Sequence, residues 1–222
     1  MIRIGMIGAD STHTEAWSRL VNLPDAPLYG QAQVVKLWGE DRDQASAKAN
    51  DCRIPAVVDT PAEALEDVDL AMIVNRYGDD HPPYARLAIE AGLPTFVDKP
   101  FANEMEDVHQ LVGLAQQRNA PLTSCSALRY AGEVMELQEK MAAFGPLNCA
   151  IVSGAAAGDF PDPRAKHPFF YGMNSARGTV RPLSSAERTS AAMIAITSTA
   201  QATGNGGSPP AAICMTRASV PA

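Results

Sequence analysis

Two segments of the sequence combine side chains that could bind a ligand and move a proton. The first, residues 75–102, places His81 in a polar loop after an apolar run and Asp98-Lys99-Pro100 after the next one. A lysine at the end of a strand, beside a carboxylate, can donate a proton to a substrate hydroxyl or stabilise an oxyanion. Pro100 is a candidate for a cis peptide bond. The alternative is a surface lysine paired with an aspartate.

The second segment is the opening stretch "IGMIGADSTHT", in which Gly8 ends a short apolar strand. Thr12 begins a Thr-x-x-Glu capping box, so we expect a helix to start there. A strand, a glycine turn and a helix N-terminus present free N–H groups to an anion, which favours a phosphate site. A G-x-G-x-x-G dinucleotide motif needs two more glycines, however, and Asp10 and His13 stand at their positions.

Each polar residue of this region therefore has two interpretations. A carboxylate close to phosphate would cost on the order of 1–4 kcal/mol, and residues 10–12 would also fit a plain helix cap. His13 is either a ligand contact or a surface or capping residue. Asp41 is a candidate for the carboxylate that binds ribose. It lies 33 residues after Gly8 rather than about 20, and it also fits a solvated turn.

The elements that must position these residues alternate between strands and helices. We expect strands at 2–7, 33–39, 55–59, 68–75 and 94–100, a sixth beginning within 120–130, and helices at 13–23, 41–52, 60–67, 81–92 and 104–119. This alternation predicts an α/β fold with a doubly wound parallel sheet. Its loops after the first, fourth and fifth strands share the carboxyl edge, where ligands bind. A further helix is expected at 133–144 and a strand at 148–156.

Residues 1 to about 173 resemble the Gfo/Idh/MocA family of NAD(P)-dependent oxidoreductases, which act mostly on sugars, inositols and related polyols. The family signature is an Asn…His loop, a helix ending near Ala-Gly, and then V-x-E-K-P-x-A. The chain matches it at Asn75, His81, Ala91-Gly92 and 97–102, with Asp98 in place of the usual glutamate. The opening loop resembles a branch in which G-x-D-[ST]-[ST]-H replaces the glycine motif.

The resemblance implies hydride transfer between a polyol and NAD or NADP. It implies that Lys99 contacts the nicotinamide ribose and the substrate and assists proton transfer, and that His81 lines the pocket as a second catalytic residue. Arg129, in "SALRY", matches an arginine at the family's entry into the second domain and is the candidate substrate-binding residue. The candidate cofactor-binding residues are Gly8, Ala9, Asp10, Thr12, His13, Asp41, Asn75, Asp98, Lys99 and Pro100.

The resemblance also divides the chain. We expect a Rossmann domain at 1–122, the start of an α+β substrate and dimerisation domain at 123–173, and an atypical, poorly ordered tail at 174–222. Asn174 stands where the family has a catalytic histidine, and an asparagine cannot shuttle a proton. We therefore expect an incomplete second domain.

The tail differs in charge from the rest of the chain, with four arginines and one glutamate against 24 acids and 14 bases in residues 1–173. Residues 178–183 can be encoded by codons that, when read one base out of frame, give the helix-like sequence Ala-Leu-Tyr-Ala-Leu. One hypothesis is that the reading frame changes near residue 173. The nucleotide sequence of the gene tests this hypothesis.

Composition excludes several classes of function. The net charge of −7 and the lack of a basic face argue against a nucleic-acid partner. No apolar run approaches the roughly 20 residues of a membrane span, and no signal peptide is recognisable. The four cysteines lack metal-ligand spacing, so we expect no metal and a reduced, cytoplasmic protein. A homo-oligomer, implied by the resemblance, is left open by the incomplete second domain.

Two alternatives to an oxidoreductase remain. One is a non-catalytic Rossmann protein that binds a nucleotide or small ligand, and the other is a truncated product without independent function.

Overall fold

The computed structural model of the chain describes residues 1–126 without a gap. Beyond them it describes residues 130–133, 135, 136, 139, 140, 147–153, 195, 196 and 212–217. The chain divides into two compact units, Met1–Ser126 and Ala127–Ala222. The first unit thus ends slightly beyond the boundary at residue 122 that the sequence suggested.

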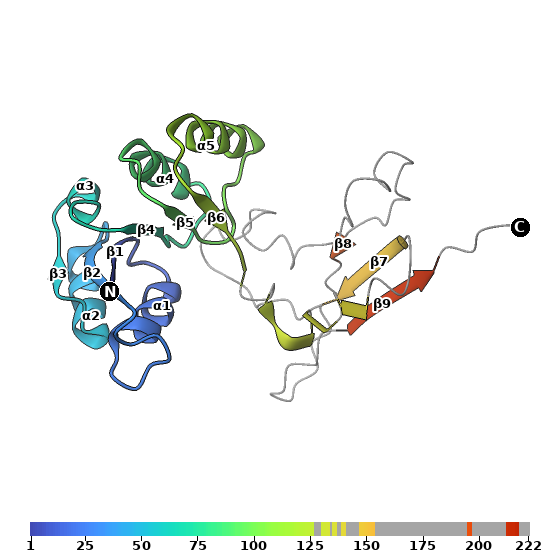
Figure 1. The fold of residues 1–222 in the computed structure, drawn as a ribbon, viewed down its shortest axis with the longest axis horizontal. Helices are drawn as coiled ribbons and strands as arrows, with labels where there is room; N and C mark the ends of the chain where they lie inside the picture. The colour runs from blue at the N-terminus through green and yellow to red at the C-terminus, as the bar shows by residue number, and fades with distance from the viewer. Residues whose placement is uncertain are drawn as a thin grey trace, which may run out of the picture. The chain divides into compact units, whose positions relative to one another are not determined.

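The first unit is built on a six-stranded parallel sheet with the strand order β3-β2-β1-β4-β5-β6 (Figure 1). The strands are β1 (Ile2–Ile7), β2 (Ala32–Trp38), β3 (Ala56–Val57), β4 (Leu70–Ile73), β5 (Thr95–Val97) and β6 (Leu122–Ser124). The helices are α1 (Thr12–Asn22), α2 (Arg42–Cys52), α3 (Pro61–Ala64), α4 (His81–Glu90) and α5 (Met105–Arg118). The predicted doubly wound sheet is confirmed. Its order reverses between β1 and β4, where such sheets bind ligands.

The central strand β1 is buried on both faces, which fixes the two layers around it. Met6 and Ile7 are both fully buried, yet they belong to different apolar clusters because successive side chains of a strand point to opposite faces. Met6 packs in the cluster that includes Val21 of α1 and Ala49 of α2. Ile7 packs in the cluster of α3, α4 and α5. Figure 1 shows α1 and α2 on one side of the sheet and α4 and α5 on the other.

Helix α1 begins with a different cap from the one that its sequence pattern suggests. Ser11 is the N-cap, and its Oγ accepts a hydrogen bond from the N–H of His13 at 3.1 Å. Thr12 is already the first helical residue. Glu15, the other half of the expected capping box, instead accepts from Lys48 Nζ at 3.1 Å. The box at Thr12 is therefore wrong, because a lysine from α2 takes the carboxylate that the box requires.

The second unit contains a three-stranded sheet with the order β8-β7-β9. Strand β7 (Leu147–Ser153), close to the predicted strand, pairs parallel with β8 (Ala195–Ile196) and antiparallel with β9 (Ala212–Arg217). The described residues between 132 and 140 are helical, as expected. Strands β8 and β9 fall within the tail, whose other residues lie outside the described part of the chain, as do Arg129 and Asn174. Among the described residues, no helix is long and apolar enough to cross a membrane.

Gly8 is the residue that lets the turn after β1 lie directly against the end of β4. Its φ is +114°, which disfavours any side chain. A Cβ at this position would also lie 2.5 Å from the backbone nitrogen of Asn75 and 2.8 Å from the carbonyl carbon of Val74. The clash is with backbone, so no side chain can move to relieve it.

We expect Gly8→Ala to lower the free energy of unfolding by about 2–3 kcal/mol, because the alanine meets both an unfavourable φ and the backbone that directly follows β4. Gly113→Ala is the matched control. A Cβ at this position of α5 would meet nothing within 4 Å beyond the backbone of its own helix. The alanine should therefore raise the free energy of unfolding by about 0.5–1 kcal/mol. Urea unfolding followed by tryptophan fluorescence reports the first unit, which holds both tryptophans, Trp17 and Trp38. Equal midpoints for the two variants would contradict this account.

Candidate active site at the carboxyl edge of the sheet

Three loops meet at the carboxyl edge of the sheet, after β1, β4 and β5. The carboxylate of Asp10 accepts the backbone N–H of Arg76 at 3.1 and 3.3 Å, which joins the first loop to the second. His13 Nδ1 hydrogen-bonds Asp98 Oδ2, which joins the start of α1 to the end of β5. The loops at the switch point of the sheet, where such sheets bind ligands in a crevice, are therefore joined to one another. The two residues that replace the motif glycines make these two contacts.

The predicted site residues separate into three groups in the structure. Asp41 follows β2 and is the N-cap of α2, and Arg129 lies outside the described residues. The others lie on the three loops or in the first turn of α1: Gly8, Ala9, Asp10, Thr12, His13, Asn75, His81, Asp98, Lys99 and Pro100. Their roles toward a cofactor remain predictions.

His81 is fully buried and connects the loops after β4 and β5. Its Nδ1 lies 2.8 Å from the carbonyl oxygen of Pro100, and its Nε2 lies 2.8 Å from that of Asn75. A neutral imidazole has one N–H, so both contacts are hydrogen bonds only when both nitrogens carry a proton. With neither nitrogen open to the crevice, the geometry favours a positioning role. The catalytic role implied by the resemblance remains a prediction.

Lys99 differs in its surroundings from the aspartate beside it. Asp98 is 2% exposed and contacts His13, whereas Lys99 is exposed. No described residue forms an ion pair with the Lys99 ammonium. Lys99 is therefore a surface lysine, as in the alternative interpretation, but it does not pair with Asp98. The expected cis peptide bond before Pro100 is confirmed. A lysine in this position is available to a ligand.

Asn75 presents an acceptor that the described residues do not use. The residue is 4% exposed, and its Oδ1 has no hydrogen-bond partner among them. An unsatisfied buried acceptor costs about 1–3 kcal/mol, so a ligand N–H at this point would remove a penalty. Together with the N-terminus of α1 and the close approach at Gly8, this oxygen fits a dinucleotide with a carboxamide group.

The acidic residue at the end of β2 that faces α4 is Glu40, not Asp41. The carboxylate of Asp41 caps α2 by accepting the N–H of Gln44 at 3.0 Å. Glu40 instead accepts the hydroxyl of Tyr84 at 3.3 Å. The Tyr84 ring lies 5.1 Å from the Trp38 ring between centroids. Sequence spacing missed Glu40, although it lies nearer to the strand end.

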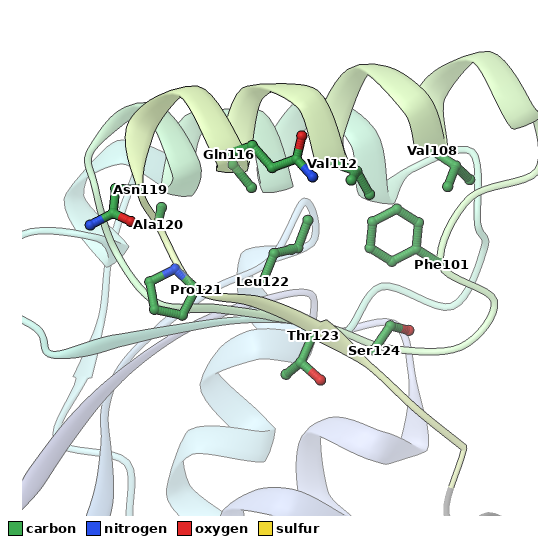
Figure 2. A pocket seen from close by; sticks show the side chains of 11 residues that line it. Phe101, Val108, Val112, Gln116, Asn119, Ala120, Pro121, Leu122, Thr123 and Ser124 are labelled. Atoms are coloured by element: carbon green, nitrogen blue, oxygen red, sulfur yellow. The ribbon is translucent and has the colours of Figure 1, made fainter.

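A cavity of about 540 Å³ lies elsewhere, between α5 and β6 (Figure 2). It is lined by Phe101, Val108, Val112, Ala115, Gln116, Asn119, Ala120, Pro121, Leu122, Thr123 and Ser124. None of these side chains is an acid, a base or a thiol, so the cavity offers no group for proton transfer. The described residues also contain no group of three or more His, Cys, Asp or Glu that could hold a metal ion.

The strand order, the turn at Gly8 and the helix that follows it define a dinucleotide-binding Rossmann protein. The model of the Gfo/Idh/MocA family, described as an oxidoreductase family with an NAD-binding Rossmann fold, matches residues 2–125. The chain belongs to this family.

Two curated relatives are inositol dehydrogenases. Inositol 2-dehydrogenase 3 of Saccharopolyspora erythraea is 29% identical over 148 residues, which cover 65% of this chain and 41% of that protein. Inositol 2-dehydrogenase of Agrobacterium fabrum is 32% identical over 114 residues, covering 50% and 32%. The chain thus spans less than half the length of these relatives.

Solved structures show the same fold. The myo-inositol dehydrogenase of Lactobacillus casei, in complex with NAD(H) and myo-inositol, aligns with a TM-score of 0.63 at 21% identity, covering 72% of this chain and 47% of that one. The UDP-N-acetylglucosamine 3-dehydrogenase of Acidithiobacillus ferrooxidans aligns with a TM-score of 0.60 at 24% identity, covering 74% and 49%.

The pairing of Glu40 with Tyr84 is testable by titration. Burial, followed by the charge of Glu40, raises the pKa of Tyr84 to about 12. We expect Glu40→Gln to lower this pKa without returning it to 10, because burial is the larger cause. At pH 11 a larger fraction of Tyr84 should then be ionised, as measured by NMR of ¹³C-labelled tyrosine. Asp41→Asn is the control and should leave the pKa of Tyr84 unchanged. An unaltered Tyr84 titration in Glu40→Gln would refute the pairing.

Proposed function

We propose that this chain binds NAD and acts as an oxidoreductase on a sugar, inositol or related polyol by hydride transfer. One observation carries the proposal: the contact between His13 and Asp98 brings the anion-binding start of α1 and the exposed Lys99 to the same crevice. The family, and relatives that are inositol dehydrogenases, support the reaction class.

In this proposal, different residues of the crevice bind different parts of the cofactor. The turn at Gly8 and the positive end of the α1 dipole hold the pyrophosphate, since a helix N-terminus attracts anions. Asn75 Oδ1 accepts a hydrogen bond from the carboxamide, and Glu40 accepts one from the adenosine ribose. When bound, the nicotinamide supplies the acceptor or donor of the hydride.

Lys99 acts on the substrate oxygen. Its ammonium is exposed and not paired with a described residue, so it can donate hydrogen bonds to an alcohol or carbonyl oxygen in the crevice. These bonds stabilise the negative charge that develops on that oxygen. His81 keeps the loop that carries Lys99 next to the end of β4. By the resemblance to the family, Arg129 completes the substrate side.

Charge at the end of β2 supports NAD over NADP as the cofactor. Glu40 places a carboxylate where a 2′-phosphate would have to lie, whereas the carboxylate of Asp41 is turned to the N–H of Gln44. The arginine that follows, Arg42, forms an ion pair with Asp59. A 2′-phosphate would therefore meet a like charge and an arginine that is already paired.

Three finer expectations join this proposal. The substrate is a small molecule, and the four scattered cysteines, of which Cys52 and Cys125 are free, are in keeping with a cytoplasmic protein. A homo-oligomer follows from the resemblance to the family.

Titration with reduced cofactor, followed by fluorescence, tests the cofactor site. We expect NADH to bind at least about tenfold more tightly than NADPH, a difference of about 1.4 kcal/mol. Glu40→Ala should reduce this ratio to about threefold or less, because it removes the ribose acceptor and one repelling charge. Asp41→Ala is the matched control and should keep the ratio. No binding at millimolar NADH would overturn the proposed function, and NADH binding without oxidation of any polyol would favour the non-catalytic alternative.

Substitution of Lys99 tests the substrate side. Lys99→Met should lower the rate of NAD-dependent myo-inositol oxidation by about 100-fold or more, because the charge next to the reacting oxygen is lost. The NADH dissociation constant should change by less than about fivefold, as expected when a transition-state contact is removed. Lys99→Arg keeps the charge and should retain part of the rate. Full activity of Lys99→Met would exclude this role.

A further inference from the structure

His13 occupies the third glycine position of the dinucleotide motif and reaches the end of β5. Its Nδ1 hydrogen-bonds Asp98 Oδ2, and the side chains are 33% and 3% exposed, respectively. Trp17, four residues later and so on the same face of α1, packs edge-on against Phe96 of β5 with ring centroids 5.6 Å apart. This face of α1 therefore lies along β5, and Ser11 fixes the N–H of His13 at 3.1 Å.

The contact with Asp98 determines which nitrogen of His13 is open. A carboxylate only accepts hydrogen bonds, so Nδ1 carries a proton and Nε2 of the neutral ring keeps its lone pair. No described residue hydrogen-bonds to Nε2 of His13. A buried carboxylate that holds one imidazole nitrogen of a partly exposed ring, while the other nitrogen has no partner among the described residues, is an arrangement suited to a general base.

The other histidines of the described chain do not offer this geometry. His81 has both ring nitrogens against carbonyl oxygens and no exposed surface. His109 lies exposed on α5, away from the three crevice loops. The charged group in contact with the His13 ring is Asp98, whose neighbour in the chain is Lys99. Glu15, two residues after His13 on α1, pairs with Lys48 of α2.

We propose that His13, oriented by Asp98, is a further catalytic residue, whose Nε2 takes the hydroxyl proton of the substrate while Lys99 donates hydrogen bonds to the oxygen. This inference rests on the proposed function. In the oxidation, the C–H bond of the alcohol carbon breaks and its electron pair leaves as hydride to the oxidised nicotinamide cofactor. The O–H proton passes to Nε2, and the carbon–oxygen bond becomes a carbonyl. The Nδ1 proton stays with His13, and Asp98 stabilises the imidazolium.

Two substitutions separate this role from a purely structural one. His13→Asn keeps an amide near the position of Nδ1, so it can still donate to Asp98, but it lacks Nε2. His13→Gln places a polar atom near the position of Nε2 and loses the contact with Asp98. A residue that only fastened α1 to β5 would be replaced adequately by asparagine.

We expect His13→Asn to leave the urea midpoint at the wild-type value and the NADH dissociation constant within about twofold of it. The same substitution should lower myo-inositol turnover by about 100-fold, chiefly in kcat. His13→Gln should lose turnover and also stability. Wild-type turnover in His13→Asn would overturn the proposal.

Labelling by diethyl pyrocarbonate, located by mass spectrometry on the full chain, gives a readout without turnover. The reagent acylates an accessible unprotonated imidazole nitrogen, so His13 and His109 should react and His81 should not. Saturating NADH should slow labelling of His13 at least about fivefold, whereas AMP, which fills only the adenosine end, should not, and His109 should be unaffected by either.

The outcomes distinguish the catalytic role of His13 from the proposed function on which it rests. NADH binding in the fluorescence titration without protection of His13 overturns the role of His13 and leaves the proposed function in place. Absence of NADH binding overturns both. Protection by NADH, with loss of turnover in His13→Asn, supports both.

Discussion

The carboxylate of Asp98 lies inside the protein, and the crevice depends on how that carboxylate is satisfied. A buried carboxylate without a partner is strongly unfavourable, and here the partner comes from His13 at the start of α1. The bond fixes α1 beside β5 and leaves the adjacent Lys99 unpaired by Asp98. One electrostatic requirement thus positions the N-terminus of α1 and an exposed lysine at the same edge.

Polar contacts at this edge complement an apolar frame beneath it. The frame is set by β1, whose neighbours Met6 and Ile7 fill separate clusters on the two faces of the sheet. Apolar packing has little directional preference, so it does not by itself place loops to within a hydrogen-bond length. Those placements come from the Asp10 contact with Arg76 and from the two contacts of the His81 ring. Strands position the loops roughly, and buried polar groups position them finely.

Local patterns in the sequence predicted the elements well and the inter-loop contacts poorly. The Thr-x-x-Glu pattern at Thr60 does cap a helix: Thr60 Oγ1 accepts the N–H of Glu63, and the Glu63 carboxylate accepts the Thr60 hydroxyl, because the two residues are local to each other. The similar pattern at Thr12 failed, since Lys48, distant in sequence, takes the carboxylate of Glu15. Residue spacing also passed over Glu40, because its contact with Tyr84 depends on how α4 packs. The ribose-binding role of Asp41 stays a prediction. Arg129 and Asn174 lie outside the described residues.

The contacts made by Asp10 and His13 change how the replacement of the two motif glycines is interpreted. In the sequence, Asp10 and His13 look like a charge and a bulky ring placed against a phosphate. In the fold, the Asp10 oxygens turn to an amide of the next loop, and the His13 ring turns to β5. Gly8, the glycine that meets backbone directly, is kept. The motif has therefore exchanged two glycines for two bonds between loops, and this exchange brings an imidazole to the edge where substrates of such sheets bind.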